Sequence, residues 1–198
     1  VAALSGAADA VRTRVPGSGA MHVGDLSLPG GGRHPRHRSH QSGRDADIFF
    51  YVASRAGAAA TPEGRAVFTR HGLALAKYLA QPGSLDPRPD LRFDDAANYA
   101  ALRQLASRGD TVWLLVSRGI KARLLSQALA REGDANILER LTWLLHQPSH
   151  VSPHDDHAHI RIGCSPEQQA LGCIERGPVW PWQRGAARFA RLARYARR

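Results

Sequence analysis

The segment His154-Asp-Asp-His-Ala-His-Ile-Arg-Ile162 alternates polar and apolar residues from His157 onward. This period of two is typical of a β-strand that turns one face toward the core. His157, His159 and Arg161 share one face, and Ala158, Ile160 and Ile162 share the other. Since alternate residues of a strand lie about 6.6 Å apart at Cα, His157 and His159 can serve the same small site.

Histidine is concentrated in this segment and in one other. Six of the ten histidines lie in two short windows, which contain His34, His37 and His40 in the first and His154, His157 and His159 in the second. Neutral imidazole is the commonest side-chain ligand of zinc and carries protons near neutral pH. The alternative is an exposed basic loop and an incidental histidine run. Together with nearby carboxylates, the two windows favour a single metal-hydrolase site.

Two apolar runs predict buried strands. Asp45-Ala-Asp-Ile-Phe-Phe-Tyr-Val52 is apolar on both faces from Ile48 onward, and Thr111-Val-Trp-Leu-Leu-Val116 has the same character. Asp47 stands at the entry of the first run. A carboxylate in that position needs a cation or several hydrogen-bond donors.

Helix signals separate these runs. Thr61 followed by Pro62 predicts a helix that extends to about Ala80, and Asp94 can cap a second helix that ends at Gly109. Further helices are expected at about 119–131 and 135–147. Residues 1–32 and the segment 81–92, which contains three prolines, are expected to be loop. The sequence thus predicts an α+β fold in which a small central antiparallel sheet carries the site, flanked by helices and long loops.

Length and charge suggest one domain and a tail. With 198 residues and 43% hydrophobic content, the chain suits a single core over residues 1–176, with a flexible approach at 1–23. No apolar run is long enough to cross a membrane, and the start lacks a signal-peptide pattern. Net charge is +10, and residues 177–198 hold six arginines and no acidic residue. We expect either a solvated basic tail or one that contacts an anionic wall polymer or membrane surface.

The two cysteines, Cys164 and Cys173, are separated by eight residues that include Pro166 and Gly172. A disulfide could close this short span and would imply an oxidising compartment, whereas two free thiols are the alternative. Neither cysteine is part of a CxxC pair, which argues against a structural zinc knuckle. A catalytic zinc needs three protein ligands and one open position. The chain offers His40, Asp47 and His159 for this role, and Gly43 lets the loop after His40 turn into the first strand.

Two motifs together resemble the penicillin-insensitive murein endopeptidases. They are Ser39-His-Gln-Ser-Gly-Arg-Asp-Ala-Asp-Ile48 and, about 110 residues later, His154-Asp-Asp-His-Ala-His-Ile-Arg-Ile-Gly-Cys164. That family belongs to the zinc peptidase group of lysostaphin, the D-Ala-D-Ala peptidases and the zinc domain of sonic hedgehog. The resemblance extends from Gly24 to Cys173. The loop Arg33-His-Pro-Arg36 departs from it, because it is more basic than the family's glycine-rich version.

The resemblance implies a set of roles. His40, Asp47 and His159 would bind zinc, and His157 would be the general base or stabilise the transition state. His154 and His37 would be further active-site histidines that orient the substrate, although exposed loop histidines without a role are the alternative. Asp155 or Asp156 could fix a histidine tautomer by accepting a ring N–H bond. The resemblance also pairs Cys164 with Cys173 and leaves His34 without a role.

The implied reaction is hydrolysis of the D-alanyl to meso-diaminopimelate amide that cross-links peptidoglycan, in the periplasm or after secretion. Water activated by zinc would attack the amide. A zinc D,D-carboxypeptidase or amidase of the same superfamily is the near alternative. A non-catalytic zinc-containing protein that binds the cell wall or another polyanion is the second. Nucleic acid is not an expected partner, because aromatic residues are hardly interleaved with the arginines.

Overall fold

The computed structural model describes residues 1–61, 65–77 and 85–184, and it has the predicted α+β fold. In chain order the elements are α1 (Ala2–Arg14), β1 (Val23–Leu26), β2 (Asp45–Phe49), β3 (Val52–Ser54), β4 (Ala59–Ala60), β5 (Arg65–Phe68), β6 (Leu73–Lys77), β7 (Leu85–Phe93), α2 (Asp95–Ser107), β8 (Thr111–Leu115), α3 (Arg118–Arg131), α4 (Ala135–Leu144), β9 (Leu145–His146), β10 (His157–Ile162), α5 (Pro166–Ala170) and the 3-10 helix η1 (Pro181–Gln183). The strands form two five-stranded sheets.

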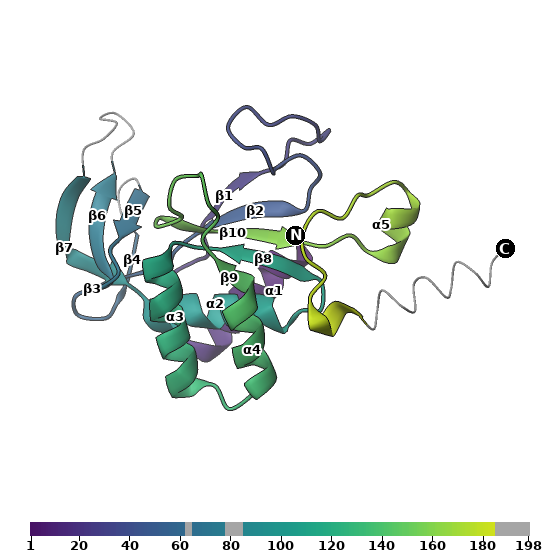
Figure 1. Cartoon of the computed structure of the whole chain (residues 1–198). Helices are drawn as coiled ribbons and strands as arrows, with labels where there is room; N and C mark the ends of the chain where they lie inside the picture. The colour runs from purple at the N-terminus through teal and green to yellow at the C-terminus, as the bar shows by residue number, and fades with distance from the viewer. Residues whose placement is uncertain (62–64, 78–84, 185–198) are drawn as a thin grey trace.

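The first sheet has the order β1-β2-β10-β8-β9, and it is antiparallel except for the β8–β9 pair (Figure 1). The alternating segment that starts at His157 forms a strand, as predicted, and it is the central strand of this sheet. Ala158 and Ile160 face the core and are almost fully buried, whereas the histidine face points the other way. The period of two in this strand therefore sets which residues face the core and which face the site.

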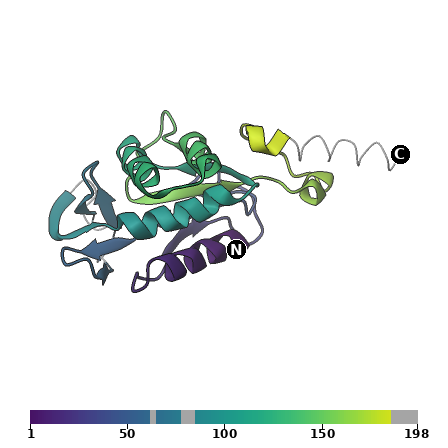
Figure 2. The ribbon, with the colours of Figure 1, turned by 90° about the horizontal axis from the view of Figure 1, so that it is seen from below.

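Helices α2, α3 and α4 lie below the first sheet in Figure 1 and pack in a layer with α1, which is visible from below in Figure 2. Asp94 caps α2 as predicted, since its side chain accepts a hydrogen bond of 3.0 Å from the backbone nitrogen of Ala97. Leu102 and Leu105 of this helix are buried. The helix expected at 135–147 ends at Leu144, because residues 145–146 pair with β8 instead.

The predicted helix from Thr61 to Ala80 is wrong over its described part, residues 65–77, which form the β5–β6 hairpin. Pro62, Glu63 and Ala80 lie outside the described residues. Alanine and leucine favour helix locally, but Ala66, Phe68 and Ala74 are buried in the strands that this segment forms. Gly72 supplies the turn with a φ of +76°, a conformation that glycine adopts without strain. Pairing with distant residues thus overrides local propensity here.

The loop predicted at 81–92 is also corrected over its described part, because β7 occupies residues 85–93 in the middle of the second sheet, which has the order β4-β3-β7-β6-β5. Residues 81–84 lie outside the described residues. Proline lacks the N–H that a strand donates to its neighbour, so it is normally confined to sheet edges and bulges. Here β3 pairs only with residues 91–93, and the ladder with β6 is irregular between Arg88 and Arg92. Pro87 and Pro89 therefore fall where one side of β7 is unpaired.

Residues 1–32 are not loop throughout, and the flexible approach expected at 1–23 is a helix over most of its length. Ala7 and Val11 of α1 are buried against α2, and β1 pairs with β2. The small residues that suggest a flexible segment have a packing role instead. Because alanine leaves little side chain between two helices, the alanine-rich faces of α1 and α2 can approach closely.

The C-terminal part of the described chain also packs on the domain. Cys164 and Cys173 form a disulfide with a Cα–Cα distance of 6.1 Å. Trp180 is buried, and its Nε1 donates a hydrogen bond of 2.8 Å to the carbonyl of Val112. Residues 177–184 are therefore folded rather than part of a free tail, and the basic segment from 185 onward lies outside the described residues. Each helix in the described part of the chain is too short or too polar to cross a membrane.

Candidate metal centre

The register between β2 and β10 brings two acidic residues to the histidine face. In this antiparallel pair, His159 lies opposite Asp47, and Arg161 lies opposite Asp45. Asp45, Asp47 and His159 are buried. His159 Nδ1 is 3.0 Å from Asp47 Oδ1, and its Nε2 is 2.9 Å from Asp45 Oδ1. Cross-strand pairing therefore fixes both ring nitrogens of His159.

The loop 27–44, which rises above β1 and β2 in Figure 1, adds a third ligating group. It returns to β2 through Gly43, whose φ is +73° and whose N–H donates to Ser27 Oγ at 2.8 Å. His40 lies just before this turn and is completely buried. Its Nε2 is 3.1 Å from His159 Nδ1 and 3.3 Å from Asp47 Oδ1. Three predicted ligands from three chain segments thus bring one atom each to the same point.

The charge balance of this group fits a bound cation. Asp45 also accepts hydrogen bonds from Arg161 at 2.8 and 3.0 Å, and it takes one ring N–H of His159. Nδ1 of His159 then faces Asp47 Oδ1 and the imidazole of His40. These groups repel the lone pair on Nδ1 unless a proton or a metal ion lies among them. Burial opposes ionisation of Asp47, but its contacts with His159 and His40 hold the pKa of Asp47 far below its usual value.

The structure also contains an overlapping set of ligating residues. His37, His40 and Asp47 each offer one atom, and these atoms lie within 4.8 Å of one another. His37 Nε2, however, is 2.7 Å from Asp25 Oδ2 and 3.8 Å from Asp47 Oδ2. The Nε2 atom of His37 therefore contacts Asp25 as well as facing the cluster.

His157 occupies the rim of this cluster. Its Nδ1 lies 2.5 Å from Asp156 Oδ1, and its Nε2 lies 3.7 Å from Asp47 Oδ1. Asp156, one of the two carboxylates that the sequence suggests as tautomer-fixing groups, contacts this ring. A carboxylate on Nδ1 leaves Nε2 available to accept a proton on the side of the ligand cluster.

His154 and His34 both lie close to the cluster. The ring of His154 is 4.9 Å from that of His157, and burial, followed by the charges of His157 and His159, lowers the pKa of His154 to about 4. Its buried Nδ1 has no hydrogen-bond partner among the described residues. His34, which the sequence leaves without a role, is buried, accepts a hydrogen bond from the backbone N–H of Arg36 and packs on His37 at 5.0 Å. It thus shapes the loop that carries His37 and His40.

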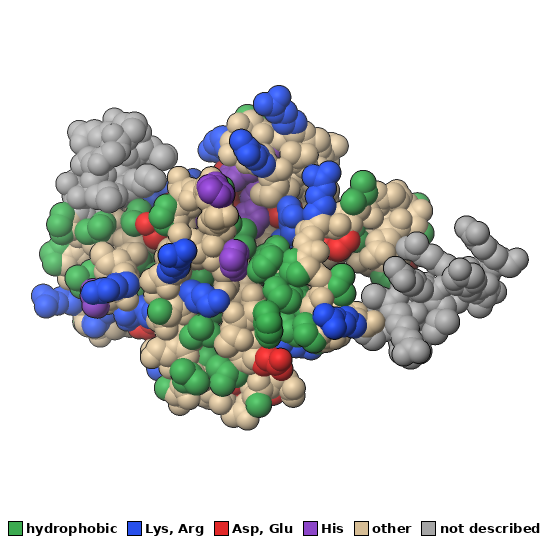
Figure 3. Space-filling model, viewed as in Figure 1, with side chains coloured by type: hydrophobic (Ala, Val, Ile, Leu, Met, Phe, Trp, Pro, Cys, Tyr) green, Lys and Arg blue, Asp and Glu red, His purple; other side chains and the backbone are tan. Residues whose placement is uncertain are grey.

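A surface pocket opens beside these residues. Figure 3 shows histidine side chains in a recess at the base of the loop 27–44, with basic side chains around it. The pocket has a volume of about 190 Å³ and is lined by Asp25, Arg36, His37, Asp47, Phe49, Arg65 and His157. The expected catalytic residues His37 and His157 therefore meet Asp47 in one accessible site, while His40 and His159 lie buried beneath it.

Three residues that lie at the site, Asp25, Asp45 and Arg65, are not identified as site residues from the sequence. Asp45 precedes Asp47 by two residues and so shares its strand face, which was a usable signal. No local pattern points to Asp25 or Arg65, because their approach to the site depends on how β1 and β5 are placed.

Comparison with known proteins gives two findings. A family model described as penicillin-insensitive murein endopeptidase matches residues 1–186. The chain is also 32% identical over 171 residues to a penicillin-insensitive murein endopeptidase of Haemophilus influenzae, an alignment that covers 85% of this chain and 51% of that protein. The chain therefore spans about half the length of this curated relative.

Proposed function

Since the chain belongs to the penicillin-insensitive murein endopeptidase family, we propose that it is a zinc-dependent endopeptidase that hydrolyses peptide cross-links in peptidoglycan. The bond would be the amide from D-alanine to meso-diaminopimelate. One observation carries this proposal: His40 Nε2, Asp47 Oδ1 and His159 Nδ1 lie within 3.3 Å of one another beside an open pocket. Two nitrogen ligands and one oxygen ligand with room for water are typical of catalytic zinc.

We assign the ligands as His40, Asp47 and His159, with His37 in the pocket wall. Two contacts favour this set over the one that includes His37. Asp45 accepts a hydrogen bond from Nε2 of His159. Metal-bound histidines usually have such a partner on the ring nitrogen that does not bind the metal. His37 instead directs its Nε2 to Asp25.

When bound, zinc would polarise the scissile carbonyl and make its water more acidic. His157 is the proposed general base, because Asp156 holds Nδ1 and Nε2 faces the ligand cluster. It would receive the proton of the attacking water and deliver it to the leaving amine. His154 stays neutral near pH 7 and is the proposed hydrogen-bonding group for the substrate carbonyl. His37, fixed by Asp25, would orient the substrate from the wall of the same pocket.

The proposed setting is the periplasm or the exterior of the cell. The cross-linked wall lies outside the cytoplasm, and the Cys164–Cys173 disulfide suits an oxidising compartment. Peptidoglycan is the proposed partner. The proposed contact of the basic C-terminal segment with an anionic wall polymer or membrane surface concerns residues outside the described part of the chain.

Cross-linked muropeptide dimers provide the test. Incubation with the protein and zinc should yield monomers, and a chelator or the His159→Ala variant should abolish this conversion. His71→Ala is a matched control, because His71 is exposed on the β5–β6 turn and its Nε2 accepts a hydrogen bond from Arg70 at 3.0 Å. Release of terminal D-alanine without dimer cleavage would instead support a carboxypeptidase. Tight zinc binding with no hydrolysis of either bond would support a non-catalytic wall-binding protein.

A further inference from the structure

Arg65 is the first residue of β5 and belongs to the second sheet, yet its guanidinium reaches the wall of the catalytic pocket. Its Nη1 lies 3.4 Å from Asp156 Oδ2, on the carboxylate that also holds His157. Its Cζ lies 5.1 Å from the centroid of the Phe49 ring. About a third of the side chain is exposed. A cation in this place is therefore both anchored and accessible.

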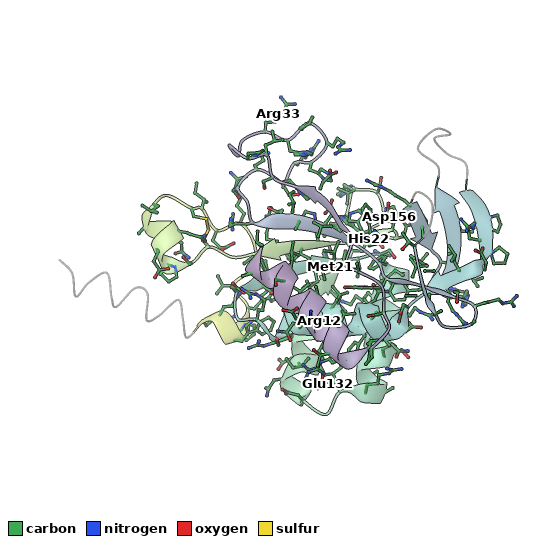
Figure 4. All side chains as sticks on the ribbon, turned by 180° about the vertical axis from the view of Figure 1, so that it is seen from behind. Arg12, Met21, His22, Arg33, Glu132 and Asp156 are labelled. Atoms are coloured by element: carbon green, nitrogen blue, oxygen red, sulfur yellow. A yellow bond between two sulfur atoms is a disulfide. The ribbon has the colours of Figure 1, made fainter. Side chains whose placement is uncertain are left out.

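Arg65 also lies between two pockets. It lines the pocket that contains His37 and His157, and with Phe49 it lines a neighbouring pocket that extends along residues 19–22 and 49–52 to Asp156. Seen from behind, the labelled Asp156 and His22 lie close together at the junction of the two sheets (Figure 4). A substrate that occupies both pockets must pass the Arg65 guanidinium.

The donors of Arg65 are largely uncommitted. A guanidinium has five N–H donors in a planar fork that matches a carboxylate. Within the described residues, the Asp156 contact is the single hydrogen bond of the Arg65 side chain. Arg36, which lines the same pocket, differs because it pairs with Asp25 at 2.5 Å and its side chain is 66% exposed. Arg65 is thus the better placed of the two to receive an additional anion.

We propose that Arg65 binds the free carboxylate on the leaving-group side of the scissile amide and so selects substrates that carry it. The inference rests on the proposed function. In the proposed cross-link, the carbon that bears the amide nitrogen also bears a carboxylate, whose carbon lies about 2.5 Å from that nitrogen by ordinary bond lengths. A scissile bond beside His157 therefore brings this carboxylate into the same pocket.

Electrostatics favours such a cation. Asp25 and Asp47 line the pocket, and Asp156 lies behind it. Arg36 and His37 already pair with Asp25, and a bound zinc ion would offset Asp47. Arg65 would supply the additional positive charge for a substrate carboxylate, and so confer specificity as well as affinity.

A purely structural role is the competing explanation, because Arg65 could act only by holding Asp156 and thereby His157. Two synthetic cross-linked muropeptide dimers separate the two roles. They are identical except that the leaving-group carboxylate is free in one and a carboxamide in the other. We expect Arg65→Ala to lower kcat/KM about 10- to 100-fold on the free carboxylate, mostly through KM, and to have little effect on the carboxamide. Arg65→Lys should restore part of the loss.

Arg55→Ala is the matched control, since Arg55 is an exposed arginine after β3 in the same sheet. It should behave as the wild type on both substrates. Equal losses for Arg65→Ala on both dimers would overturn the proposal and leave Arg65 as a positioning residue for Asp156. If the wild type cleaves neither dimer, the proposed function fails. Equilibrium binding of free-carboxylate and carboxamide monomers to wild type and Arg65→Ala would then still decide the role of Arg65.

Discussion

Replacing Asp45 by asparagine tests the link between the fold and the metal centre. Asp45 is buried and accepts one hydrogen bond from His159 and two from Arg161. Asparagine keeps the shape and one acceptor oxygen, but it loses the charge and directs an NH2 group at Arg161. Burial opposes ionisation of Asp45, yet hydrogen bonds from His159 and Arg161 lower its pKa, so the wild-type group is a carboxylate at neutral pH.

The substitution should affect metal binding through His159 and the stability of the folded chain through Arg161. Loss of a carboxylate that orients a metal-bound histidine typically weakens metal binding 10- to 100-fold, which is about 1.4–2.8 kcal/mol. The metal-free protein should also lose about 2–3 kcal/mol of stability, because hydrogen bonds to charged groups contribute about 1.5–3 kcal/mol each. Water limits this loss, since the Arg161 side chain is 17% exposed and can be partly rehydrated. Asp110→Asn is a control, since Asp110 pairs with Arg108 at a partly exposed site away from the metal centre.

Zinc affinity should be measured by competition with a chromogenic chelator, and stability by thermal unfolding with and without zinc. The variant should show a smaller zinc-induced rise in Tm than the wild type, because a weaker ligand stabilises the folded state less. Unchanged zinc affinity in a folded Asp45→Asn protein would refute the assignment of His159 as a ligand held by Asp45.

Three further outcomes are expected. Ile160→Ala removes an almost fully buried side chain from the central strand and should lower the free energy of unfolding by about 2–5 kcal/mol in denaturant titrations; a loss below about 1 kcal/mol would contradict the packing. Hydrogen bonds from Arg103 lower the pKa of Glu132, at the end of α3 (Figure 4), to about 2. The pKa of glutamate in the unfolded chain is near 4.3. Above that pH the ion pair should therefore add about 1–2 kcal/mol to the free energy of unfolding after solvent screening, and this contribution should be lost as the pH falls toward 2. Glu132→Gln should remove that part of the pH dependence of stability. Chelation of the metal should lower the Tm of the wild type but not of His40→Ala, which would show the same Tm with and without chelator.

Much of the first sheet could be predicted from the sequence. The strands at Asp45, Thr111 and His157 have local signals that tertiary packing reinforces, namely β-branched residues in two cases and strict alternation in the third. The cap at Asp94 is equally local. Where local and tertiary preferences disagree, prediction fails: β5 and β6 are rich in helix-forming residues, and β7 contains prolines, so their pairing becomes evident only when all three strands are assembled.

The histidine windows and their order along the chain are properties of the sequence, and so is the shared strand face of His157 and His159. They were sufficient to suggest a metal site and a family, because ligand chemistry depends on residue type and local spacing. The strand register that sets His159 against Asp47, the engagement of His37 by Asp25 and the approach of Arg65 from the second sheet were decided by the tertiary structure alone. These contacts join segments far apart in the chain, and the pairing of distant segments depends on the packing of the whole core rather than on any local pattern.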